Sequence, residues 1–178
     1  MRGFKAVALL AMVVALSAAA GAGVQEHHHG EEAVGQRLGS VHFPISCSPL
    51  SQTHFERGVA LLHSFGYGAA QKEFQAIEKQ EPKCAMAYWG EAMTLYPQLW
   101  DRPSAKDLAR GKELVSRGQA AGPKTAREEG FRHAAVAFYG GGSEMPFEAR
   151  ADSYRAALAR LHARFPADHE AAIFSALR

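Results

Sequence analysis

The chain has 178 residues and a formal net charge of +2, from 20 Lys and Arg against 18 Asp and Glu. This length is enough for one domain with a sizeable hydrophobic core. The near-balance of charge, without clustered Lys or Arg, argues against nucleic acid as a partner.

The first 22 residues have the layout of a secretory signal peptide. Arg2 and Lys5 give a positive start, residues 6–16 form an apolar stretch without a charge, and small residues follow. We therefore expect cleavage after Ala20 or Ala22, an extracytoplasmic location (periplasmic or secreted) and no membrane contact afterwards. The alternative is an uncleaved anchor, although the strongly apolar stretch is short for a membrane span.

Residues 23–45 are predicted to be a flexible leader that ends in an extended segment. Residues 23–40 are polar, contain many Gly, Glu and His, and show no apolar period, which is typical of disorder. Residues 41–45 alternate like a strand, but Pro44 favours an extended segment. We expect this segment to pack along the first helices.

Apolar periodicity and end signals predict helices through the rest of the chain. Ser51 is expected to cap the first helix, and Gly66 and Gly68 to end it. The second helix ends at Glu81-Pro82, because a helix rarely continues through proline. The third, at about residues 85–96, is apolar nearly all round and must be covered on more than one side.

Four more helices follow. Ser104 with Asp107 forms a capping box that begins the fourth, and Thr125 with Glu128 begins the fifth. The sixth, over residues 147–165, has the clearest amphipathic pattern. These helices are predicted to end at Gly122-Pro123, at the break Gly140-Gly141-Gly142 and at Pro166, respectively. Asp168 is expected to cap the start of a last helix at Ala171 to Leu177.

Cys47 and Cys84 lie just before the first and third predicted helices. In a stack of helix pairs these two helix starts are neighbours, roughly 10 Å apart, and the segment 46–50 could close that gap. Export makes a disulfide plausible. We favour a bridge over the alternative of two independent buried thiols.

From about Ser46 to Arg178 the chain resembles the tetratricopeptide repeat (TPR) family. The residues that carry the resemblance are Gly58, Ala70, Phe74 and Pro82 in a first unit and Ala87, Tyr88 and Ala92 in a second. Gly58 and Ala92 are 34 residues apart, the period of that family. More narrowly, Leu61 to Phe65 and Cys84 to Gly90 look like exported bacterial members with a Cys-Ser-Pro segment. Leu61 and Glu91 depart from the family, which usually has an aromatic residue and a leucine there.

The resemblance implies an all-α fold, an α-α superhelix of stacked antiparallel helix pairs with irregular repeats over residues 46–178. It also implies a scaffold that binds a protein or peptide partner on its concave face, with no catalysis of its own. Family geometry places these apolar candidates on that face: Phe55, Val59, Leu62, Met86, Trp89, Met93 and Tyr96. The alternative is that the chain's own residues 41–50, or the loop at Trp100, cover them and make them core. No charged residue interrupts the row, which favours self-coverage.

Other motifs give no stronger prediction of chemistry. His27-His28-His29 could bind zinc or copper, but adjacent histidines in a flexible leader form no defined site. Gly140 to Ser143 could meet an anion, yet it lacks the lysine and the preceding strand of a phosphate loop, and a linker is the better interpretation. The sequence has no Cys-x-x-Cys motif to support redox or haem chemistry, and no Ser-His-Asp set stands out. We expect neither an enzyme nor a cofactor or metal.

Two alternatives to the pure scaffold remain. One is a metal-binding or enzymatic accessory protein that uses the histidines near the N-terminus. The other is a piece of a longer array whose activity lies elsewhere, because the sequence ends inside a predicted helix without a polar capping repeat. We then expect Ile173, Phe174 and Leu177 to be uncovered and to favour self-association.

Overall fold

The computed structural model describes residues 38–97 and 101–176, and within these ranges every regular element is an α-helix. The predicted all-α class is confirmed for this part of the chain. The helices are α1 (Pro49–His63), α2 (Tyr67–Gln80), α3 (Ala85–Thr94), α4 (Ala105–Ala121), α5 (Ala126–Tyr139), α6 (Phe147–Arg164) and α7 (His169–Ala176). The predicted signal peptide, His27 to His29, Trp100 and Leu177 lie outside the described residues. Among the described helices, none has the length and hydrophobicity needed to cross a membrane.

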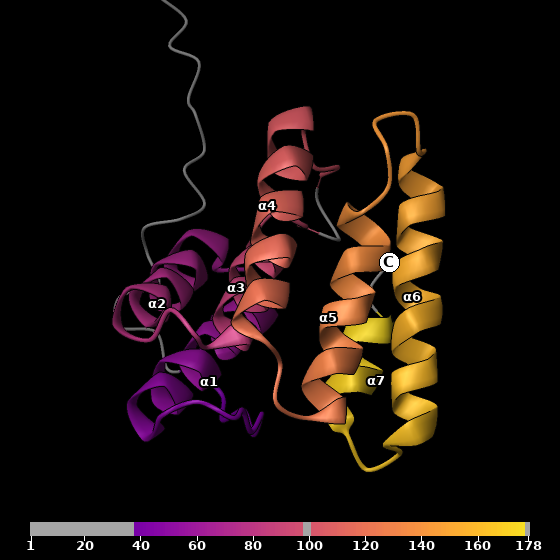
Figure 1. The fold of residues 1–178 in the computed structure, drawn as a ribbon. Coiled ribbons are helices and arrows are strands. Elements are labelled where there is room, and N and C mark those ends of the chain that lie inside the picture. Colours follow the sequence, from indigo (N-terminus) through magenta and orange to yellow (C-terminus); the bar gives the residue numbers. More distant parts are fainter. Residues whose placement is uncertain (1–37, 98–100, 177–178) are drawn as a thin grey trace, which may run out of the picture.

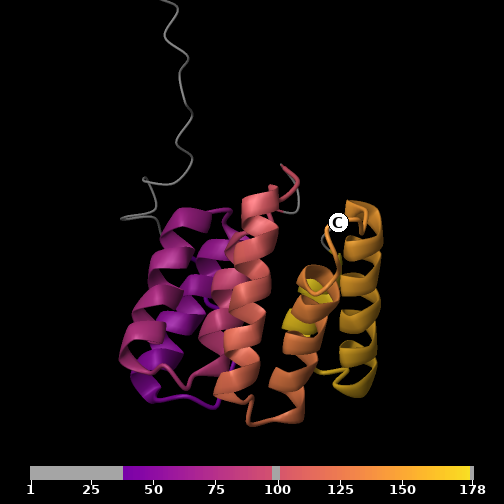
Figure 2. The same ribbon diagram turned by 45° about the horizontal axis from the view of Figure 1, so that its top comes forward.

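The helices pack in antiparallel pairs, α1 against α2, α3 against α4 and α5 against α6 (Figure 1). The first helices of the pairs also touch, because α3 contacts both α1 and α5. Figure 2 shows α1 to α4 standing side by side, with α5 and α6 continuing the row. The last helix, α7, packs against α6. This arrangement confirms the predicted helix pairs.

The first helix begins earlier than predicted. Its N-cap is Ser48, whose hydroxyl accepts a hydrogen bond from the Ser51 amide, and Pro49 occupies the first turn. Proline is favoured there because its fixed φ suits a helix start and its missing N–H is not needed. The Ser51 hydroxyl instead donates to Glu81 at the end of α2, with an O–O distance of 2.7 Å. The expected cap at Ser51 is therefore wrong by three positions.

Other helix ends are closer to the predictions. Both capping boxes form, at Ser104 with Asp107 and at Thr125 with Glu128. Gly68 lies inside α2 rather than before it, and α3 ends at Thr94, two residues earlier than expected.

A disulfide joins Cys47 to Cys84, with the two Cα atoms 5.6 Å apart. It fastens the segment before α1 to the residue before α3, as the sequence predicts. The side chain of Glu81 strengthens the same corner, because its Oε2 accepts hydrogen bonds from the Ser48 amide and the Ser51 hydroxyl. The disulfide thus ties the first helix pair to the second at one end, and the Glu81 carboxylate ties the end of α2 to the start of α1.

The ring of Phe74 in α2 packs between α1 and α3. A Cβ atom added to Gly58 of α1 would lie 2.6 Å from the Phe74 ring, and one added to Gly90 of α3 would lie 2.4 Å from it. The ring therefore fits only because both facing positions lack a side chain. Gly58 belongs to the predicted repeat pattern. Gly90 does not, because the residue 34 positions after Gly58 is Ala92.

We expect loss of the disulfide to lower the free energy of unfolding by about 3–4 kcal/mol, because the bond closes a loop of 37 residues in the unfolded chain. Guanidinium unfolding of the Cys47→Ser/Cys84→Ser double variant against the oxidised wild type measures this difference. Reduced wild type should behave like the double variant. Thiol titration of the unfolded, unreduced protein should find no free cysteine; two free thiols would contradict the bridge.

We expect Gly90→Ala to destabilise the protein by about 1–3 kcal/mol, because overpacking against Phe74 outweighs the gain of about 1 kcal/mol in helix propensity. Gly118→Ala in α4 is the matched control, since its added Cβ would lie 3.3 Å from the Ala85 carbonyl oxygen and 3.4 Å from Tyr88 Cβ. Thermal unfolding followed by circular dichroism compares them. Equal changes for the two variants would refute the special role of the Phe74 contact.

Candidate peptide-binding groove

Residues 41–48, which we call the arm, run without helical structure across α1, α3 and α5. The side chain of Phe43 is fully buried among one aromatic ring from each helix. Its ring centroid lies 5.0 Å from that of Phe55, 5.4 Å from Trp89 and 4.7 Å from Phe131. We call the surface of α1, α3 and α5 beneath the arm the arm groove. Phe43 anchors the arm in this groove by burial and by ring contacts.

Side chains of the groove also bind the amide groups of the arm. The Phe43 N–H donates to Glu56 at 3.1 Å and the Ile45 N–H donates to Gln52 at 2.8 Å, both on α1. The Ser46 N–H donates to Glu128 on α5, with an N–O distance of 2.6 Å. An extended segment cannot satisfy these groups within itself, so the groove supplies the acceptors.

The carbonyl groups of the arm accept hydrogen bonds from side chains of α1, of α5 and of the residue Lys124 before α5. The Gln52 side-chain amide donates to the Phe43 carbonyl at 2.9 Å, so this one residue binds both an N–H and a C=O of the arm. Arg127 donates to the Pro44 carbonyl at 3.0 Å, and Lys124 donates to the Ser46 carbonyl at 3.1 Å. The Arg127 guanidinium carbon also lies 4.1 Å from the centroid of the Phe43 ring. The arm is held through its main chain and one aromatic anchor.

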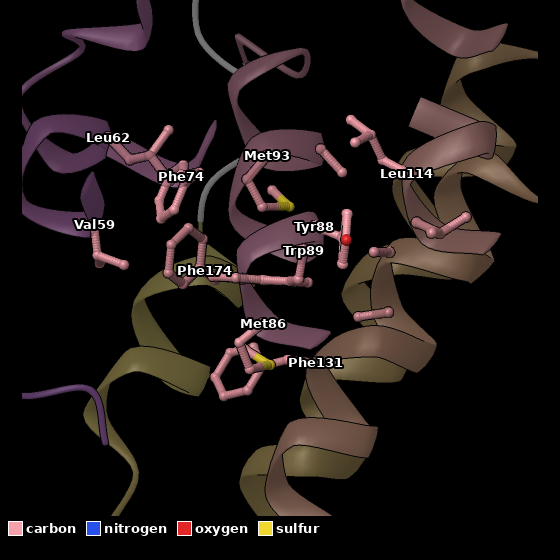
Figure 3. Close-up of a cluster of buried hydrophobic side chains, with 14 of the residues drawn as sticks. Val59, Leu62, Phe74, Met86, Tyr88, Trp89, Met93, Leu114, Phe131 and Phe174 are labelled. Carbon is pink, nitrogen blue, oxygen red and sulfur yellow. The ribbon is translucent and has the colours of Figure 1, made fainter. Parts of the chain in front are cut away.

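The far side of the aromatic cluster is closed by α7. Phe174 packs against Trp89, with ring centroids 5.2 Å apart (Figure 3). The expectation that Phe174 is uncovered is therefore wrong, since it is 3% exposed, whereas Ile173 is exposed as expected. His63 of α1 pairs with Glu170 of α7 at 2.8 Å. Asp168, just before α7, forms an ion pair with Arg127, with a closest N–O distance of 2.6 Å. Helices α1 and α7 therefore meet although more than one hundred residues separate them in the sequence.

The seven candidate partner-binding residues all lie in the core of this structure. Each has at most 7% of its surface exposed, and the set is Phe55, Val59, Leu62, Met86, Trp89, Met93 and Tyr96. The arm and α7 both contact Trp89 in this set, while Tyr96 stacks on Phe138 of α5. Self-coverage is therefore what the described residues show, and helices distant in the sequence provide much of the cover.

Two of the seven candidates, Phe55 and Trp89, contact the Phe43 ring, but the side chains that bind the main chain of the arm are not in that set. Family geometry places Gln52 on the same concave side as the candidates, whereas Glu56 and Arg127 carry no signal in the sequence. Glu128 is predicted only as part of a capping box. It does cap α5, since its Oε2 accepts from the Lys124 and Thr125 amides, and its Oε1 accepts from the Ser46 amide. One carboxylate thus serves both the helix start and the arm.

A second cluster of polar groups lies between α2, α3 and α4. Glu91 is only 1% exposed and accepts hydrogen bonds from Arg110 at 3.1 Å, from Gln75 at 3.1 Å and from Gln71 at 3.4 Å. Glu78, 9% exposed, pairs with Arg117 at 3.2 Å. These donors explain how a glutamate is accommodated at position 91, where the resembling family usually has leucine.

The Glu78 and Glu91 carboxyl groups shift each other's pKa in opposite directions. Burial, followed by the hydrogen bond to Glu91, raises the pKa of Glu78 to about 8. Burial alone would raise the pKa of Glu91, but hydrogen bonds from Glu78, Gln75 and Arg110 lower it. Glu78 therefore remains the protonated donor and Glu91 the charged acceptor. Both are closed off from solvent, so a substrate has no access to them.

Among the described residues, no group of three or more His, Cys, Asp or Glu side chains is arranged to hold a metal ion. Two helical histidines each meet a glutamate, His63 with Glu170 and His133 with Glu129. The predicted weak site at His27 to His29 lies outside the described residues.

We expect the stability of the protein to decline as the pH rises from about 5 to 8. The folded protein keeps the Glu78 proton up to a pKa of about 8, whereas the unfolded chain releases it near the ordinary value of 4.5. The stability from the protonated group is therefore complete below pH 4.5 and is lost as the pH rises through the folded pKa. The lowered pKa of Glu91 acts in the opposite sense, but mainly below this window.

Glu78→Gln should remove this decline, because the amide is neutral at every pH. Urea unfolding at pH 5, 6, 7 and 8 measures it, with Glu144→Gln as the control because Glu144 is exposed and distant in the chain. An unchanged pH dependence in Glu78→Gln would show that the proton is not held there.

Comparison of the chain with protein-family models, with curated proteins and with solved structures found no match. The TPR resemblance therefore stays a prediction that rests on the residues named above.

Proposed function

We propose that the chain is an exported TPR-like scaffold that mediates protein–protein interaction by holding an extended peptide segment in the arm groove. In this structure the occupant is the chain's own arm. The proposal includes no catalysis, and it takes a protein or peptide as the partner.

The observation that supports it best is the way in which the arm is bound. Side chains from α1, from α5 and from Lys124 just before it make six hydrogen bonds to main-chain groups of residues 43–46. Any extended peptide offers the same main-chain groups in the same register, so these contacts do not depend on the arm's side chains. The buried ring of Phe43 adds specificity for an aromatic residue.

The arm competes strongly with such a partner for the arm groove. The Cys47–Cys84 disulfide tethers it at the edge of the groove, which keeps its effective concentration high. A partner segment therefore gains access when the arm's own contacts are weakened. The disulfide also agrees with an extracytoplasmic location, since such bonds persist in oxidising compartments.

We expect a synthetic peptide of residues 39–46 to bind in trans to the full chain carrying Phe43→Ala, and far more weakly to the wild type. Phe43→Ala removes the anchor from the tethered arm and leaves in place the groove side chains that make the six hydrogen bonds to main-chain groups. In a Trp100→Phe background, fluorescence of Trp89 reports occupancy, because its ring contacts Phe43.

The same peptide with alanine in place of Phe43 is the control, and it should not produce a saturable change. Gln52→Ala serves as a second receptor variant, because it frees two arm hydrogen bonds and leaves the aromatic core intact. Folding of both variants is checked by circular dichroism. No saturable signal with either folded variant, or an equal signal from the alanine peptide, would overturn the proposal.

A further inference from the structure

The connection between α5 and α6, residues 140–146, is organised around the side chain of Arg150. Its Nη1 donates to the Phe138 carbonyl at 2.8 Å and its Nε donates to the Met145 carbonyl at 3.1 Å. Its Nη2 donates to the carbonyls of Gly141 and Gly142. The glycine run, expected from the sequence to be a flexible break, is thus fastened to α6 through the carbonyl oxygens of Gly141 and Gly142, and the flanking residues through two more.

Arg150 brings a buried positive charge into this connection, and no acidic side chain among the described residues pairs with it. The residue is 3% exposed, and all four of its acceptors are neutral carbonyl groups. Four bonds also leave one of its five N–H donors without an acceptor among the described residues. A guanidinium held away from water without an anionic partner is unfavourable, so a negative charge placed beside it would be stabilising.

A cavity of about 230 Å³ lies next to this group. Lys112 of α4, the ring of Tyr139, residues 141–143 and Arg150 line it, and none of its described lining residues is acidic. Lys112 is exposed and forms no ion pair within the described part of the chain. The lining therefore holds two positive charges from two different helices, one buried and one mobile enough to follow a ligand.

The glycine run contributes unused donors at the same place. The amide N–H groups of Gly141, Gly142 and Ser143 bond to no acceptor among the described residues, since the loop's internal bonds run from Gly140 to Val136 and from Met145 to Gly142. A Cβ atom added to Gly142 would meet nothing within 4 Å, so this position is open. Free amides next to positive side chains are the usual components of a phosphate site.

We propose that this cavity binds a phosphate group, with charge from Lys112 and Arg150 and hydrogen bonds from the amides of residues 141–143. The glycine run by itself lacks the lysine of a phosphate loop, and in the fold α4 supplies one. Two acidic side chains lie near the lining without being part of it. Glu144 accepts a hydrogen bond from the hydroxyl of the lining residue Ser143, and Asp107 accepts from Ser104 in its capping box. The volume suits inorganic phosphate or the phosphate of a small monoester.

Calorimetric titration of the full chain with inorganic phosphate, at constant ionic strength set with chloride, tests the site. We expect saturable binding of one phosphate, weakened about tenfold or more in Lys112→Ser through loss of a charge-assisted hydrogen bond. Lys106→Ser is the matched control, because Lys106 is an exposed lysine of the same helix that does not line the cavity. Its affinity should equal that of the wild type.

A parallel titration with glycerol 2-phosphate separates the two sources of the phosphate group. Tighter binding of inorganic phosphate identifies the free ion as the ligand, and equal or tighter binding of the ester identifies a monoester; either result supports the site. No saturable binding up to about 50 mM, an affinity typical of non-specific contact, would overturn it. An equal loss of affinity in the Lys112 and Lys106 variants would overturn it as well.

Discussion

The arrangement of the helices depends on the ring of Trp89 in α3. Phe43 of the arm, Phe55 of α1, Phe131 of α5 and Phe174 of α7 all contact it, with ring centroids between 5.2 and 6.0 Å away. The arm and α1, which are adjacent in the sequence, therefore meet the distant helices α5 and α7 on one side chain. Its Nε1 is buried without a hydrogen-bond partner, which costs about 1–3 kcal/mol. Contact with four aromatic rings offsets that loss, since such pairs each contribute about 0.5–1.5 kcal/mol beyond area burial.

Around this apolar centre, carboxylates at the helix ends each serve a local and a distant partner. Glu128 caps α5 and binds the arm, and Glu81 ends α2 and binds the residues at the start of α1. Asp168 accepts from the Ala171 amide in the first turn of α7 and pairs with Arg127 of α5. The hydrogen bond from Ser51 is the largest cause of a lowered pKa at Glu81. Because one carboxylate has two acceptor oxygens, a helix cap can also fix the position of a neighbouring segment.

The parts of this fold that are predictable from the sequence are the local ones. Both capping boxes, the antiparallel pairing and the Cys47–Cys84 bridge follow from residues close in sequence or from the expected stacking of adjacent helices. For the seven apolar candidate residues, the sequence leaves two alternatives open, a binding face or a covered core. The meeting of His63 with Glu170, and of Phe43 with Phe131, joins residues about ninety or more positions apart, and no local pattern encodes such a contact.

The candidate sites are less predictable from the sequence than the fold is. Gln52, Glu56 and Arg127 become groove residues only because the arm lies across them, and Lys112 reaches the glycine run only through the packing of α4 against α5. A signal does exist at Glu91, where a charged residue interrupts an otherwise apolar helix. Since a buried carboxylate requires donors in fixed directions, Gln71, Gln75 and Arg110 hold α2 and α4 in one register against α3. Aromatic packing near Trp89 is less directional, so the hydrogen bonds to Glu91 fix the relative positions of α2, α3 and α4 more strictly than the aromatic contacts do.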